Sequence, residues 1–108
     1  MTSGIPGPVA ATFSSHLNSK FRLVDTPSTE LELIEVSDAS TSHHVSFSLV
    51  FLGPHQPLLP QRIYPLEHHA LGRLDLFIVP IRRDAQGLQY QAIFNRVNEP
   101  AANANASR

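Results

Sequence analysis

The segment from residue 71 to residue 95 constrains the fold most strongly, because it has the pattern of a β-hairpin. Large apolar residues recur at every second position on both sides of a turn at residues 84–87. This period of two places one face of each strand against a core. The alternating residues are Leu74, Leu76, Ile78, Tyr90, Ala92 and Phe94. The hairpin therefore predicts a domain built from antiparallel β-structure.

Four further segments show strand patterns and precede the hairpin. They are residues 20–24, 30–36, 45–53 and 61–67. In the second of them the alternation changes phase near Leu33 and Ile34, which predicts a β-bulge there. Before the first strand, Phe13, Leu17 and Phe21 recur every four residues, which predicts a short helix capped by Thr12.

These elements predict an all-β fold, a six-stranded antiparallel meander with one short N-terminal helix. A strongly twisted sheet of this size tends to curl into a small closed or partly open barrel, because closure removes its edges. An open sheet covered by the helix is the alternative. We expect a single β domain at residues 12–96, with disordered tails at residues 1–11 and 97–108, where breakers or small polar residues prevail.

Composition excludes several classes of function. The chain has no cysteine, so disulfide frameworks and thiolate zinc sites are excluded. A formal net charge of −1 provides no basic field for nucleic acid and no polybasic membrane anchor. No apolar run approaches a membrane span or a signal peptide, so we expect a cytoplasmic protein without nucleic-acid or membrane partners.

Both faces of the predicted hairpin are apolar, which indicates a candidate interface. A four-residue loop at 84–87 would pair Phe77 with Phe94 and Ile81 with Tyr90, forming a strip on the face opposite Leu76. A slip of one residue would instead pair Leu76 with Phe94 and break the strip. An uncovered strip of this kind is typical of a surface for another protein or for self-association. The alternative is that the short helix or the far side of a barrel covers it. The candidate interface residues are Phe77, Val79, Ile81, Tyr90 and Phe94.

Histidine is the only residue type that suggests a metal site. The pairs His43-His44 and His68-His69 flank the third and fourth predicted strands. If these strands pair with each other, His44 faces His69, and neutral imidazoles there are candidate ligands for zinc, copper or nickel. A third ligand such as Glu67 or Asp38 would be needed, because successive strand residues point to opposite faces. A solvated loop cluster is the alternative, and we expect no cofactor and no metal.

Sequence signatures of enzymes are missing. The chain has no Gly-x-Ser-x-Gly elbow, phosphate loop, His-Glu-x-x-His helix or thiol nucleophile. Serine, histidine and aspartate occur, but no spacing singles out a catalytic triad. We therefore expect no catalytic residues and no enzymatic activity.

Four blocks of sequence together resemble an uncharacterised bacterial family of small single-domain proteins, a domain of unknown function. The blocks are residues 47–54, 59–68, 71–80 and 90–95. The resemblance runs from about Phe13 to Asn95 and brings no catalytic residues with it. It also implies an association with phage-tail-collar-like proteins and thus an accessory role in assembly. We accordingly expect a non-enzymatic interaction or assembly module, with a small-ligand or metal-binding β-barrel as the alternative.

Overall fold

The computed structural model describes residues 9–97 and confirms an all-β fold with one short helix. The elements are α1 (Ala10–Ser14), β1 (Lys20–Leu23), β2 (Glu30–Asp38), β3 (His44–Gly53), β4 (Arg62–His68), β5 (Gly72–Asp84) and β6 (Gly87–Val97). The helix begins at Ala10, so two residues assigned to the N-terminal tail belong to it. Val9 is the N-cap of this helix, and Val97, assigned to the C-terminal tail, is the last residue of β6. Residues 1–8 and 98–108 of the two predicted tails lie outside the described residues.

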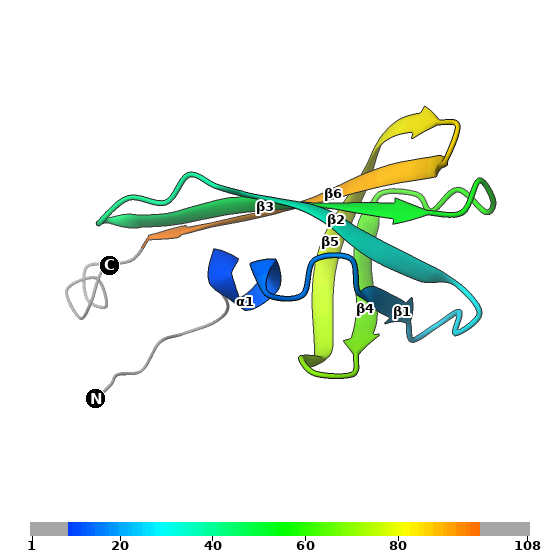
Figure 1. Cartoon of the computed structure of the whole chain (residues 1–108), viewed down its shortest axis with the longest axis horizontal. Coiled ribbons are helices and arrows are strands. Elements are labelled where there is room, and N and C mark those ends of the chain that lie inside the picture. The colour runs from blue at the N-terminus through cyan, green and yellow to red at the C-terminus, as the bar shows by residue number, and fades with distance from the viewer. Residues whose placement is uncertain (1–8, 98–108) are drawn as a thin grey trace.

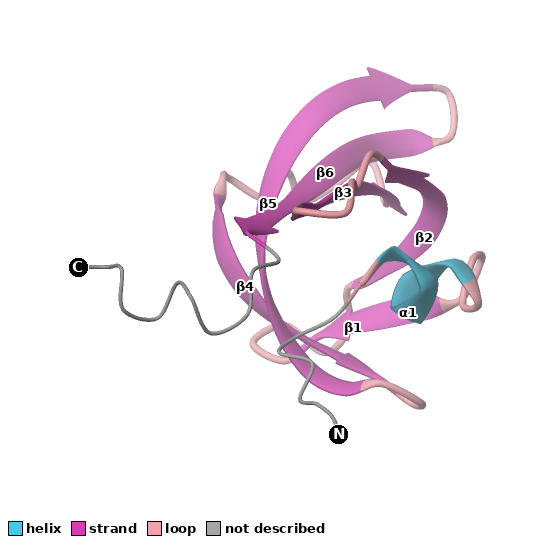
Figure 2. Ribbon diagram, turned by 90° about the vertical axis from the view of Figure 1, so that its left-hand side faces the viewer, coloured by secondary structure: helices cyan, strands magenta, loops and turns pink. Residues whose placement is uncertain are grey.

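The six strands are antiparallel and pair in a closed ring, in the order β1-β2-β3-β6-β5-β4 (Figures 1 and 2). The ring closes because β1 pairs with β2 along one edge and with β4 along the other. The predicted meander is wrong at one connection, since β3 pairs with β6 and not with β4. The segment between β3 and β4 is therefore a crossover and not a hairpin loop.

Two tyrosines hold this crossover in place. The N–H of Leu59 donates a 3.1 Å hydrogen bond to the Tyr90 hydroxyl oxygen, and the Tyr64 hydroxyl donates a 2.5 Å bond to the carbonyl of Pro60. The Leu59 side chain is buried in the core. A proline-rich loop has few backbone donors, so these anchors explain how it keeps a fixed path without strand pairing.

Alternate residues of the strands fill the interior of the ring, as the period of two predicts. On β3 the inward residues are Val45, Phe47, Leu49 and Phe51, and all four are buried. The register of β2 against β3 shifts between Leu33 and Glu35, which confirms the predicted bulge. The cross-strand neighbours on the inner face thus form one continuous hydrophobic core.

Helix α1 covers the inner face of the sheet where β3 and β6 extend beyond β5 (Figure 1). Phe13 is fully buried, with its ring centroid 5.5 Å from that of Phe94 and 5.9 Å from that of Phe47. Leu17, predicted to stack beside Phe13, is 44% exposed. That prediction fails because the helix ends at Ser14 and the chain turns at Asn18, which has a φ of +70°. No helix within residues 9–97 is long and apolar enough to cross a membrane.

Candidate functional site

The outer face of β4 and β5 carries adjacent apolar side chains that the fold leaves uncovered. Ile63 of β4 lies directly opposite Phe77 of β5, and these side chains are 61% and 49% exposed. Val79 follows on the same face of β5 and is half-buried. Ile93 is 64% exposed on the outer face of the next strand, β6. We call Ile63, Phe77, Val79 and Ile93 the outer apolar patch.

A gap in strand pairing runs through this patch. The ladder between β5 and β6 extends from the turn only as far as the pair Val79 and Gln91. Beyond it, the register partners of residues 72–78 lie on β4, and those of residues 92–97 lie on β3. Phe77 and Ile93 therefore stand on two strands that diverge, each beside a backbone edge without a neighbouring strand among the described residues.

The predicted interface strip is split between two faces of the sheet. Phe77 and Ile81 are exposed and Val79 is half-buried, as a surface strip requires, but Tyr90 is buried at 1% exposure. Phe94 is half-buried and stacks on Phe47 with ring centroids 4.5 Å apart. Tyr90 and Phe94 thus belong to the inner face. For Phe94, the alternative that the short helix covers the strip is correct, through Phe13.

A second β-bulge causes this split. The predicted register holds at the turn, where Asp84 faces Gly87 and Arg82 faces Gln89. Between Pro80 and Arg82 the register then shifts by one residue, so Pro80 faces Tyr90. A shift of one residue reverses which side chains share a face. Phe77 consequently points outward while Tyr90 and Phe94 point inward.

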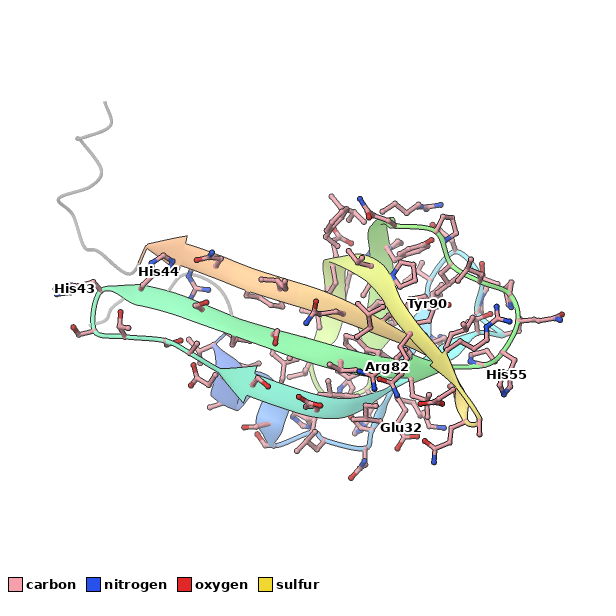
Figure 3. The ribbon with its side chains drawn as sticks, turned by 90° about the horizontal axis from the view of Figure 1, so that it is seen from above. Glu32, His43, His44, His55, Arg82 and Tyr90 are labelled. Atoms are coloured by element: carbon pink, nitrogen blue, oxygen red, sulfur yellow. The ribbon has the colours of Figure 1, made fainter. Side chains whose placement is uncertain are left out.

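The two histidine pairs do not meet. His44 faces Val97 on β6 and its ring is hydrogen-bonded to Asn95, whereas His69 follows the end of β4. Figure 3 shows His43 and His44 at the far tip of β3, at the opposite end from Tyr90. The proposed pairing fails because Phe47 faces Phe94 and not Leu66.

The third ligands considered for a metal are also engaged elsewhere. Glu67 pairs with Arg22, and Asp38 accepts a 3.0 Å hydrogen bond from the N–H of Ser40. That hydrogen bond lowers the pKa of Asp38. Within residues 9–97, no group of three or more histidine or acidic side chains is arranged so that it could hold a metal ion.

A groove of about 670 Å³ lies on the outside of β1, between the α1–β1 connection and the β4–β5 turn. Its lining is mainly polar and charged: Ser19, Lys20, Arg22, Glu30, Glu67, His68, His69 and Gly72. Four of the charges in this region form a row across four strands, because Glu30, Arg22, Glu67 and Arg73 are successive register partners. Alternating signs in such a row favour this register, and the row contrasts with the apolar patch.

His68 is buried and its ring is held at both nitrogens. The N–H groups of Ala70 and Leu71 donate to its Nδ1 at 3.0 and 3.1 Å. Nδ1 must therefore be unprotonated, so the ring proton is on Nε2. Nε2 then donates a 2.9 Å bond to Ser19 Oγ, and the Ser19 hydroxyl donates a 2.5 Å bond to the carbonyl of His16.

This direction of hydrogen bonding decides what the Ser19 and His68 pair can do. A serine nucleophile needs a histidine nitrogen that accepts its proton. Here Nε2 donates to the serine, and the serine proton is engaged by His16. These hydrogen bonds make the pair a structural link between the α1–β1 connection and the β4–β5 turn.

Burial lowers the pKa of His68 below its ordinary value of 6.5, and the neighbouring imidazoles of His69 and His16 lower it further. The ring centroids of His16 and His69 lie 4.8 and 4.6 Å from that of His68. Phe21 packs on the same ring at 4.5 Å. The environment therefore favours the neutral imidazole that the hydrogen bonds require.

Sequence reasoning missed this cluster, although one signal points to it. Tyr64, Leu66 and His68 occupy every second position and are all buried, so the inward face of β4 extends one step beyond the predicted strand end. No comparable pattern identifies Ser19 or His16, because they lie in an irregular connection. Ile63 and Ile93 of the outer apolar patch were also missed, since outward apolar residues follow the same alternation as inward ones.

Comparison with known proteins gives a family but no named relative. The search of curated proteins and the search of solved structures found no match. A family model described as "Domain of unknown function (DUF6916)" matches residues 8–94. The matched segment contains α1, β1 to β5 and most of β6, and therefore both the outer apolar patch and the His68 cluster. The chain belongs to the DUF6916 family.

Proposed function

We propose that this protein is a non-enzymatic interaction or assembly module that binds a partner protein through the outer apolar patch. The observation that carries the proposal is the exposure of Ile63 and Phe77, which are cross-strand neighbours on β4 and β5, together with exposed Ile93 on the outer face of β6. Single exposed apolar residues are ordinary, but a contiguous group on one face is typical of a protein-binding surface.

The gap between β5 and β6 supports a particular mode of binding. Unpaired strand edges hold rows of N–H and C=O groups that can pair with an added strand. An extended segment of a partner beside β6 residues 92–95 would use this edge and could place apolar side chains against Phe77 and Ile93. Backbone pairing would supply affinity, and the apolar side chains would supply specificity.

The alternative is a small-ligand or metal-binding β-barrel, and it rests on the groove beside His68. The interior of the ring is filled by large side chains, including Phe21, Phe51 and Tyr90, so a ligand would occupy the outside. Acidic and basic groups are balanced in that groove, where Arg22 neutralises Glu67. We favour the interaction module because the apolar patch fits one class of ligand, the surface of another protein. The balanced charges of the groove indicate no particular class of ligand.

Further parts of the proposal come from the sequence: the location from the lack of an apolar run typical of a signal peptide or a membrane span, and the other two from the family resemblance. A bacterial origin, a cytoplasmic location and an accessory role beside phage-tail-like proteins are consistent with an assembly module that carries no catalytic motif. We propose them together with the interaction surface. The identity of the partner captured in the experiment below tests the accessory role.

The proposal is tested by site-specific photocrosslinking in the producing cells. A photoreactive phenylalanine analogue replaces Phe77 in the patch or, as the control, Leu58, which is 53% exposed in the crossover loop. We expect a defined crosslinked product from position 77 and none from position 58. The product is identified by mass spectrometry, and its binding is then reproduced with purified components.

Two results would count against the proposal. One is a crosslinking pattern that is the same at positions 77 and 58. The other is a purified partner whose affinity is unchanged by Phe77→Glu. A product containing two copies of this chain would instead support self-association through the same surface.

A further inference from the structure

We propose that His68 is a latch that holds in its neutral form only, and that its protonation opens the end of the ring where the α1–β1 connection meets the β4–β5 turn. The inference is independent of the proposed partner surface. The latch lies at one end of β4, and Ile63 of the outer apolar patch lies toward the other.

The hydrogen bonds explain why protonation must break the latch. The Nδ1 of His68 accepts two backbone N–H groups, from Ala70 and Leu71. A proton on Nδ1 turns the acceptor into a donor, so three N–H groups would then point at one another. The turn or the ring must move, and Leu71, which packs against the core, moves with the turn.

The other side of the ring transmits the change to the α1–β1 connection. Nε2 of His68 is bonded to Ser19, whose hydroxyl and N–H both donate to the carbonyl of His16. The N–H of His16 in turn donates a 2.8 Å bond to the carbonyl of Phe13, the residue that anchors α1. Movement of the His68 ring therefore loosens the segment that follows the helix.

Most of the titratable and charged groups around the ring would not stabilise a protonated His68. His69 stacks on it and His16 meets it edge-on, and a cation on His68 would repel either of them once charged. Lys20 and Arg22 of β1 line the same groove. The acids there are Glu67 of β4, which is paired with Arg22, and Glu30 of β2, the register partner of Arg22. None of the hydrogen bonds described for the ring joins it to a carboxylate that would stabilise its charged form.

The sign of the pH effect follows from these contacts. The pKa of His68 is lower in the folded protein than the ordinary value of 6.5, which applies to the unfolded chain. As the pH falls through 6.5, the unfolded chain takes up a proton that the folded protein does not. The contribution of neutral His68 to the free energy of unfolding is therefore fully present above pH 6.5 and is lost as the pH falls below this value. Each unit of pKa lowering corresponds to about a tenfold change in the folding equilibrium.

The test compares the wild type with His68→Asn at pH 7.5 and pH 5.0. An asparagine oxygen can accept the N–H groups of Ala70 and Leu71 but does not titrate. We expect the urea midpoint of the wild type to fall on acidification, and that of His68→Asn to fall clearly less. His43→Gln, at the exposed tip of the β2–β3 loop, is the matched control and should behave as the wild type does. An equal fall in all three proteins overturns the latch.

A second measurement uses the wild type alone, in case the variant does not fold. Nitrogen-15 NMR of the imidazole should show the Nε2–H form of His68 at pH 7.5. Amide exchange at Ala70 and Leu71, corrected for its intrinsic pH dependence, should lose protection by about tenfold at pH 5.0 for each unit of pKa lowering. An Nδ1–H form, or protection that does not change with pH, contradicts the proposal.

Discussion

The two faces of β5 carry similar residues with different roles. Leu76 and Ile78 point inward and are almost completely buried, while Phe77 between them points outward and is half exposed. Side chains from the other strands of the ring pack over the inner face, whereas the outer face at Phe77 remains in contact with water. The difference shows that apolar character alone does not make a residue part of the core. Which face of the strand turns toward the interior of the ring decides it.

The largest expected effect is on the inner face. Leu76→Ala removes a buried side chain and should lower the free energy of unfolding by about 2 to 5 kcal/mol. Phe77→Ala removes a larger side chain, yet we expect a loss of only about 1 kcal/mol, because half of that side chain is already in water. Urea denaturation of both variants measures the contrast. Equal losses would mean that the two faces contribute alike to folding.

An intermediate effect is expected for Tyr90, which separates its core role from the predicted interface role. Tyr90→Phe keeps the ring but leaves the buried N–H of Leu59 without its hydrogen-bond acceptor. The free energy of unfolding should fall by about 1 to 3 kcal/mol. Tyr64→Phe is the control, since it frees the carbonyl of Pro60, an exposed residue that water can reach, and should cost less. A Tyr90→Phe protein as stable as the wild type would contradict the stabilising role of the Tyr90 hydroxyl in the crossover.

A small effect on stability is expected for Val79→Glu. Val79 lies half-buried on the outer face, so the new carboxylate can reach water. The variant should remain soluble and folded, within about 1 kcal/mol of the wild type, while association with a partner is lost. Circular dichroism and denaturation measure the first result, and titration with the crosslinked partner measures the second. An insoluble or unfolded variant would place Val79 in the core.

Much of this fold is predictable because apolar and polar residues alternate within short segments of the sequence. The turn at 84–87, the bulge beside Leu33 and the inward face of β3 each follow from a short stretch of sequence. The second bulge also had a local signal, since proline within a strand favours bulges and edges, and Pro80 precedes Ile81. To predict that Phe77 and Tyr90 lie on opposite faces, the register set by the turn at 84–87 has to be combined with the bulge indicated by Pro80.

The rest depends on contacts between distant segments. Pairing of β3 with β6 instead of β4 has no local signal, because a proline-rich loop suits a hairpin and a crossover equally well. In the observed pairing His44 lies away from His69, so the candidate metal site, which was not the favoured interpretation of the sequence, loses its basis. The His68 cluster joins segments about fifty residues apart, and its bond to Ser19 appears only after the ring has closed.

The most direct test of the two-faced account measures stability and partner binding on the same Phe77→Glu protein. The account predicts a free energy of unfolding within about 1 kcal/mol of the wild type. It also predicts at least a tenfold loss of affinity for the crosslinked partner, or about 1.4 kcal/mol, with Leu58→Glu unchanged in both quantities. Unchanged affinity, or a loss of affinity that accompanies unfolding, would contradict it.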